Sequence, residues 1–137
     1  MIVYKSGYKY QLVKDYKVNI NVYPVTTITL GYITLQPSGM SGMLTIKRGY
    51  AWDGPSGPTI DTANFMRGSL VHDVLYQLMR HGLLSKEKKD VADRELQRMC
   101  IEDGMSKIRA AWIYQGVKIC GGSAIKASGR KLIRYAP

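Results

Sequence analysis

The fold of this protein is decided by residues 62–104, which read TANFMRGSLVHDVLYQLMRHGLLSKEKKDVADRELQRMCIEDG. Apolar residues recur in this stretch at helical spacing, and turn residues interrupt the pattern. Thr62 or Asp61 can cap a first helix that runs to about Arg80. A glycine just past the last turn is typical of a helix end, and Gly82 takes that position.

Two further helices are expected downstream. Ser85 can cap a helix that runs to about Glu102, and Gly104 lies at its end. Ser106 can cap a third helix that runs to about Cys120. Because the connections are short, we expect the first two helices to form an antiparallel hairpin. The packing face of the third helix is predicted to hold Ile108, Ala111, Trp112 and Gln115.

Upstream of the helices the sequence predicts strands. Polar and apolar residues alternate from Tyr16 to Val22, which indicates a strand with one buried and one exposed face. A β-branched run covers Thr27–Leu35, residues 36–42 (QPSGMSG) are typical of a turn, and residues 43–48 return as a strand. This order predicts an antiparallel β-meander followed by helices, which is an α+β fold.

A length of 137 residues predicts a single domain over residues 1–137. Within it we expect the β-meander over residues 1–50 and an irregular loop, rich in glycine and proline, over residues 51–61. The helical part covers residues 62–122, and a basic tail covers residues 123–137.

The composition is that of a globular protein, since hydrophobic residues make up 45% of the chain. No apolar run approaches the roughly 18 residues of a membrane helix, and the N-terminus lacks the apolar region of a signal peptide. The two lone cysteines make neither a disulfide framework nor a metal pair, and we expect both to be small core residues. These features favour synthesis in the cytosol.

Charge is distributed unevenly along the chain, whose formal net charge is +10. Residues 106–137 carry seven lysine and arginine side chains and no acidic one. Such a segment attracts nucleic acid, anionic lipid or an acidic protein, and it is equally compatible with a solvated basic tail.

Three polar residues occupy helix positions that face inward. His72 and Tyr76 are four residues apart on one face, and Asp93 is followed at i+3 and i+7 by Leu96 and Cys100. A buried carboxylate is costly unless something pairs with it. In an antiparallel hairpin, His72 and Tyr76 are the natural partners of Asp93.

These residue types suit general base catalysis. Histidine titrates near neutral pH, and a carboxylate on its far nitrogen fixes the tautomer and stabilises the imidazolium. Asp73 points about 100° away from His72 on the helix and can bind a cation. The glycine-rich backbone upstream can aim carbonyl oxygens at one point, as Ca²⁺ requires. A metal there can polarise an ester carbonyl and stabilise its oxyanion.

At these residues the sequence resembles known families. Residues 72–76 (HDVLY) have the His-Asp-x-x-Tyr pattern of phospholipase A2, and residues 92–96 (ADREL) look like the second helix of that family. Residues 50–57 (YAWDGPSG) are similar to its calcium loop, so the likeness covers about residues 50–103. The whole chain also resembles a small protein family of unknown function in tailed phages and prophages.

The phospholipase resemblance implies a role for each matching residue. His72 would activate the attacking water, Asp93 would orient His72, and Tyr76 would bond the Asp93 carboxylate. Asp73 would be the side-chain ligand of Ca²⁺. The carbonyls that would complete the metal site lie near Trp52, Gly54 and Ser56.

The favoured function is Ca²⁺-dependent hydrolysis of a phospholipid ester by a phage-encoded protein that its basic segment draws to an anionic membrane surface. The alternative is a non-catalytic virion or tail-associated protein with other phage structural proteins as partners. In that case His72, Tyr76 and Asp93 form a buried brace, and the tyrosine-rich strand half serves as an interface. Nucleic-acid binding by the basic segment is a third reading. For the phospholipase and for the virion protein alike, we expect synthesis in the host cytoplasm. The virion protein would in addition be found in the phage particle.

Overall fold

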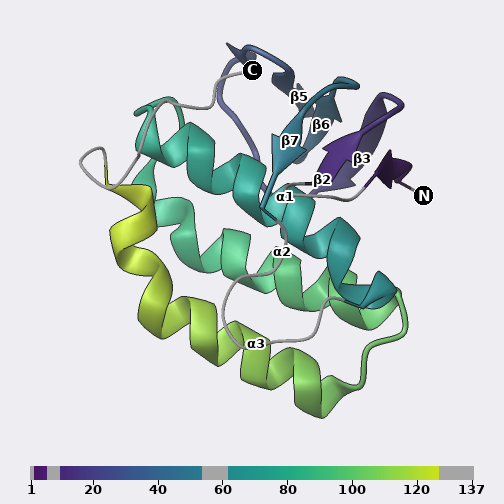
Figure 1. The fold of residues 1–137 in the computed structure, drawn as a ribbon. Helices are drawn as coiled ribbons and strands as arrows, with labels where there is room; N and C mark the ends of the chain where they lie inside the picture. The colour runs from purple at the N-terminus through teal and green to yellow at the C-terminus, as the bar shows by residue number, and fades with distance from the viewer. Residues whose placement is uncertain (1, 6–9, 54–61, 127–137) are drawn as a thin grey trace. The chain divides into compact units, whose positions relative to one another are not determined.

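The computed structural model describes residues 2–5, 10–53 and 62–126. The fold is α+β, with strands followed by helices, as the sequence predicts (Figure 1). The chain forms two compact units, residues 1–54 and residues 55–136. The organisation as one domain stays a prediction.

The described strands of the first unit form two antiparallel sheets. The smaller sheet has the order β1 (Tyr4–Lys5), β2 (Tyr10–Leu12) and β7 (Ala51–Trp52). The larger sheet has the order β3 (Tyr16–Ile20), β6 (Ser41–Ile46), β5 (Ile33–Ser38) and β4 (Ile28–Leu30). The succession β4–β5–β6 is the predicted meander, and β3 pairs with the other edge of β6.

Burial alternates along the strands of the larger sheet. In β3, Tyr16 and Ile20 are buried, whereas Lys17 and Asn19 are exposed. The antiparallel register sets Tyr16 opposite Ile46. The sequence predicted this alternation correctly, because side chains on a strand point to opposite faces with a period of two. The buried members of β5 and β6 are Ile33, Leu35, Leu44 and Ile46.

One hairpin turn was not predicted, and another is shorter than predicted. The β-branched run Thr27–Leu35 contains two strands, because the chain reverses after Gly31, whose φ is +55°. The turn expected over residues 36–42 is confined to Gly39 and Met40, since β5 and β6 extend to either side of it. Gly39 has a φ of +62°, and glycine adopts this left-handed backbone without steric cost.

The predicted loop over residues 51–61 begins as a strand. Ala51 and Trp52 form β7 and pair with β2. The Trp52 ring packs against the rings of Tyr4 and Tyr10 at centroid distances of 5.9 and 5.7 Å. Trp52 is therefore buried. Asp53 follows β7. The rest of the predicted loop, residues 54–61, lies outside the described residues.

Helices form the second unit. They are α1 (Ala63–Arg80), the 3-10 turn η1 (Lys86–Lys88), α2 (Lys89–Glu102), α3 (Lys107–Cys120) and the 3-10 turn η2 (Gly121–Ile125). Helix α2 packs against both α1 and α3, and the three helices lie side by side (Figure 1). None of the helices in the described part of the chain has the length and apolar character of a membrane span.

Most helix ends match the sequence prediction. Gly82 and Gly104 follow α1 and α2 with φ values of +73° and +102°. The Ser106 hydroxyl accepts a hydrogen bond from the Arg109 N–H and caps α3. Two starts differ. Thr62 takes the N-cap position of α1, but its hydroxyl binds the Asn64 side chain instead of the helix backbone. Ser85 caps η1, so α2 begins at Lys89.

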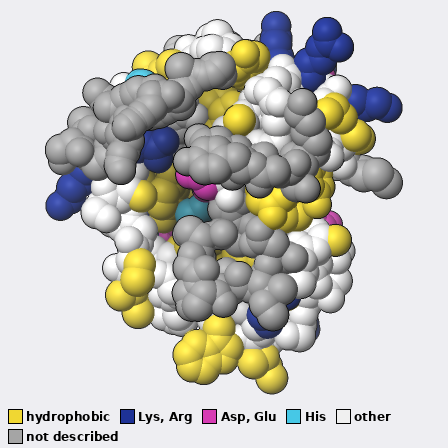
Figure 2. All heavy atoms as spheres, in the orientation of Figure 1, with side chains coloured by type: hydrophobic (Ala, Val, Ile, Leu, Met, Phe, Trp, Pro, Cys, Tyr) yellow, Lys and Arg dark blue, Asp and Glu magenta, His cyan; other side chains and the backbone are white. Residues whose placement is uncertain are grey.

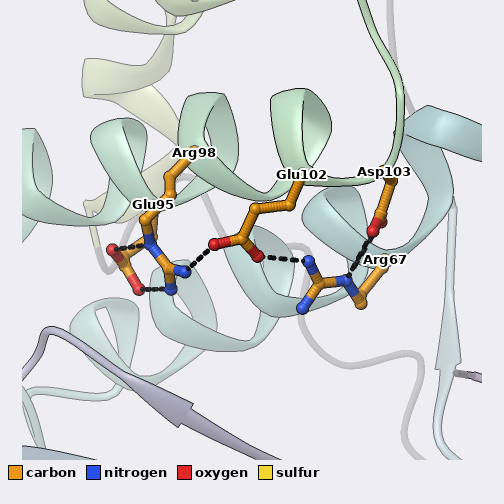
Figure 3. Close-up of polar contacts among 5 residues, drawn as sticks. All are labelled: Arg67, Glu95, Arg98, Glu102 and Asp103. Carbon is orange, nitrogen blue, oxygen red and sulfur yellow. Dashed lines mark hydrogen bonds and ion pairs between the residues drawn. The ribbon is translucent and has the colours of Figure 1, made fainter.

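The first two helices form the predicted antiparallel hairpin. Gly68 of α1 permits the close approach, because a Cβ there would lie 2.9 Å from the Leu96 side chain and 3.2 Å from the Cys100 sulfur. Near the start of α1, Arg67 forms ion pairs with Glu102 and Asp103 at the end of α2, at 2.8 and 3.0 Å (Figure 3).

The same ion-pair network continues along α2. Arg98 binds both carboxylate oxygens of the buried Glu95 at 2.6 and 3.0 Å, and it also reaches Glu102 at 2.6 Å (Figure 3). A buried carboxylate needs such a partner. The Arg67 pairs join the start of α1 to the end of α2, whereas the Arg98 pairs lie within α2.

The predicted packing face of α3 is wrong. Ile108, Ala111, Trp112 and Gln115 are all exposed, and the buried positions are Ala110, Ile113 and Tyr114. Apolar residues recur at helical spacing on both sides of α3, so periodicity alone did not identify the buried side. Cys100 is buried as expected, but Cys120, at the end of α3, is exposed.

Candidate functional site

Asp93 lies where the three helices of the second unit meet. It occupies the middle of α2 and its side chain has no solvent exposure. His72 and Tyr76 reach it from α1, and Lys89 lies one turn earlier on α2. The inward placement that the sequence predicts for His72, Tyr76 and Asp93 is present, since all three are buried.

One carboxylate oxygen of Asp93 takes both predicted contacts. Its Oδ1 lies 2.8 Å from His72 Nε2 and accepts a hydrogen bond from the Tyr76 hydroxyl at 2.6 Å. The two rings of α1 also contact each other, with centroids 4.0 Å apart. An ionised carboxylate can only accept, so Nε2 carries a proton, and in a neutral imidazole Nδ1 is then the ring nitrogen without one. The His72 side chain keeps 9% exposure.

Lys89 is a member of the cluster that was not predicted from the sequence. Its Nζ donates to Asp93 Oδ2 at 2.8 Å and to the main-chain carbonyls of Val117 and Lys118 at 3.0 and 3.3 Å. The i,i+4 spacing of Lys89 and Asp93 was the available signal for the first contact. The carbonyls belong to the last turn of α3, where cations are favoured, and only the tertiary fold brings them there.

A glycine closes the other side of the polar centre. Gly121 opens η2 directly after α3, and a Cβ at this position would collide with the Tyr76 hydroxyl. The segment from Lys118 to Gly121 therefore packs directly on the His72–Asp93–Tyr76 group. All three helices and η2 contribute to one closely packed cluster.

The electrostatics of the cluster favour an ionised Asp93. Burial alone pushes the pKa of this carboxyl upward, but hydrogen bonds from His72, Lys89 and Tyr76 outweigh it and hold the pKa below its usual value. Burial, together with the hydrogen bond to Asp93, raises the pKa of Tyr76 far above its usual range. Tyr76 is thus a fixed hydrogen-bond donor.

The lowered pKa of Asp93 predicts a dependence of stability on pH. A native pKa below the unfolded value means that the carboxylate contributes stability above about pH 4, which is lost as pH falls through the native pKa. Asp93→Asn should therefore cost about 1–3 kcal/mol at pH 7 and progressively less below pH 4. Urea unfolding of both proteins between pH 3 and 7 measures this difference, and a constant difference would contradict the assignment.

Of the four residues expected at a calcium site, the structure describes Asp73 and Trp52, and the site stays a prediction. Asp73 is half-buried on α1, in the helical unit, and Trp52 lies in β7 of the other unit. Gly54 and Ser56 lie outside the described residues. No group of three or more His, Cys, Asp or Glu side chains among the described residues could hold a metal ion. The predicted ligands are Asp73 and main-chain carbonyls, which are oxygen donors of the kind that Ca²⁺ prefers.

The cluster has the chemistry of an oriented base. Asp93 holds His72 through Nε2, as the carboxylate of a catalytic triad holds its histidine, and leaves Nδ1 to take a proton from water. The arrangement also has the features of a brace, because Lys89 neutralises Asp93 and fastens it to α3. The geometry of the cluster is compatible with a catalytic base and with a structural brace.

Comparisons with protein-family models, with curated proteins and with solved structures found no match. The assignment of function therefore depends on the site itself.

Proposed function

We propose that this chain is a phage-encoded esterase of the phospholipase A2 kind, which hydrolyses an acyl ester of phospholipid with Ca²⁺ as cofactor. The supporting observation is the 2.8 Å contact between His72 Nε2 and Asp93 Oδ1, made between two antiparallel helices at a buried position. Tyr76 adds a second donor to the same oxygen.

In the proposed reaction, His72 Nδ1 takes a proton from water while the water oxygen attacks the acyl carbon. The ester C–O bond then breaks, and the leaving alkoxide of the lysophospholipid takes the proton from His72. The fatty acid and the lysophospholipid are the products. Asp93 keeps the imidazole in the required tautomer and stabilises its positive charge during the step. Tyr76 restrains Asp93, because its hydroxyl stays protonated.

Asp73 and the carbonyls near Trp52, Gly54 and Ser56 are the proposed ligands of Ca²⁺. When bound, the ion would supply positive charge for the developing oxyanion. Synthesis in the cytoplasm of a phage-infected host would bring the protein to anionic lipid at the inner membrane face.

The direct test is release of fatty acid from vesicles of mixed zwitterionic and anionic phospholipid. Purified protein should release fatty acid with 1 mM Ca²⁺ and lose at least about 90% of that rate when EGTA is added, as expected of a step that needs metal charge. Mg²⁺ is the matched control, because it prefers compact octahedral sites and dehydrates reluctantly. Absence of fatty acid release in all conditions would contradict the proposal.

Lys89 favours a second candidate function, a non-catalytic component of the phage particle. Its Nζ joins Asp93 to the carbonyls of α3, so the carboxylate already has a positive partner and gains less from an imidazolium. In this reading the cluster holds the three helices together. The mutations in the Discussion distinguish the two functions, because a brace affects stability and a catalyst affects turnover.

A further inference from the structure

Helix α3 exposes an apolar stripe that its packing does not use. Ile108, Trp112 and Ile119 are separated by four and seven residues, so they lie along one line of the helix. Their exposed fractions are 74%, 74% and 77%. Figure 2 shows hydrophobic side chains, in yellow, projecting at the lower edge, where Figure 1 places α3. We call Ile108, Trp112 and Ile119 the α3 stripe.

The α3 stripe is separate from the core of the helical unit. The buried positions of α3, Ala110 and Ile113, pack with Phe65 and Leu96 in one hydrophobic cluster. A helix that packs through one face has no need of large apolar residues on the other. Grouped exposed apolar side chains on a protein surface are typical of a binding site.

The charges that α3 itself carries have one sign, while Asp90 of α2 accepts a hydrogen bond from the Tyr114 hydroxyl and interacts with Lys118. Lys107 and Lys118 are exposed on α3, and no residue from Lys107 to Cys120 is acidic. Helix α2 differs, since its exposed face pairs Arg94 with Asp90 and Arg98 with Glu102. A mixed-charge face suits water, whereas an apolar stripe with lysines at its margins complements an anionic surface that has an apolar interior.

Phospholipid fits this pattern better than a folded partner does. Tryptophan prefers the boundary between headgroups and acyl chains, where its ring is buried in part. Lysine side chains can extend from the same depth to anionic headgroups, and each contributes attraction near the surface. Trp112 supplies the aromatic ring, and the exposed Lys107 and Lys118, about 100° around the helix from the α3 stripe, supply the cations at its margin.

We propose that the outer face of α3 docks on an anionic phospholipid surface, with the α3 stripe inserted at the headgroup boundary and Lys107 and Lys118 contacting lipid phosphates. This inference rests on the proposed function in its choice of lipid as partner. Docking needs no hydrolysis, so the two can fail separately.

The test is sedimentation of protein with vesicles of phosphatidylcholine and phosphatidylglycerol at 100 mM salt. The double variant Ile108→Ser/Trp112→Ser should lower the partition coefficient at least about tenfold, because it removes two large apolar side chains from the interface. The matched control is Val25→Ser/Met40→Ser, which alters two exposed apolar residues of the strand unit. This control should bind as the wild type does.

Two further measurements separate insertion from other causes. In Trp52→Phe the remaining tryptophan is the exposed Trp112, whose emission should shift to shorter wavelength on vesicles and be quenched by brominated acyl chains. If Trp52→Phe fails to fold, Ile119→Glu tests insertion of the α3 stripe instead, and this variant should lose vesicle binding. His72→Ala should still bind vesicles, because His72 is not part of the α3 stripe. A wild-type protein that binds vesicles without hydrolysing lipid would refute the proposed function and leave the docking inference standing.

Vesicle binding that is unchanged by Ile108→Ser/Trp112→Ser would overturn the inference. So would vesicle-free self-association that the same double variant abolishes, because a second copy of the chain would then cover the α3 stripe. Binding to duplex DNA in place of vesicles, with steep dependence on salt, would overturn it as well.

Discussion

His72→Ala is expected to lower the rate of fatty acid release from mixed vesicles by about 10²–10⁴-fold, because the variant lacks the proposed base that would take the proton from water. The rate is measured with Ca²⁺ at saturating vesicle concentration. His81→Ala is the matched control, since His81 lies exposed at the end of the same helix and should leave the rate unchanged.

Loss of activity has meaning only if the variant folds. Circular dichroism and a urea titration of His72→Ala should show native helix content, since Asp93 keeps Lys89 and Tyr76 as partners. A His72→Ala protein that is folded and fully active would refute the catalytic role. Equal loss in His72→Ala and His81→Ala would do the same.

Asp93→Ala is expected to lower the free energy of unfolding by about 3–5 kcal/mol at pH 7, a large part of the stability of a small domain. The substitution leaves the donors of His72, Tyr76 and Lys89 facing a buried cavity without their acceptor. Urea unfolding followed by circular dichroism measures the change.

Glu87→Ala is the control for this prediction, because Glu87 is an exposed acidic residue in η1, just before α2. Its effect should stay within about 0.5 kcal/mol. A loss below about 1 kcal/mol in Asp93→Ala would mean that the donors find water or other partners, and that the cluster does not hold the helices together. If Asp93→Ala unfolds the helices while the wild type hydrolyses no lipid, the brace accounts for the cluster.

The sequence predicted the helices and the central contact because both depend on local signals. Helix ends at Gly82 and Gly104 follow from glycine at positions with positive φ. The contact between His72 and Asp93 follows from two inward-facing polar residues and a short connection, which allows few other arrangements.

Features that depend on tertiary packing were not predictable in this way. The buried side of α3 was ambiguous, since Ala110 and Ile113 on one side are three residues apart and Ile108 and Trp112 on the other are four apart, and both spacings are helical. The link from Lys89 to the end of α3 joins residues that are distant in the sequence. The exact position of the short turn at Gly39 was not predictable, because several turn-forming residues surround it in the sequence.

The central claim is that His72, oriented by Asp93, directs water to an acyl ester. Its most direct test is hydrolysis in ¹⁸O-labelled water, with both products analysed by mass spectrometry and His72→Ala run beside the wild type. The account predicts one labelled oxygen in the fatty acid, none in the lysophospholipid, and almost no product from the variant. Label in the lysophospholipid, or equal product from both proteins, would contradict it.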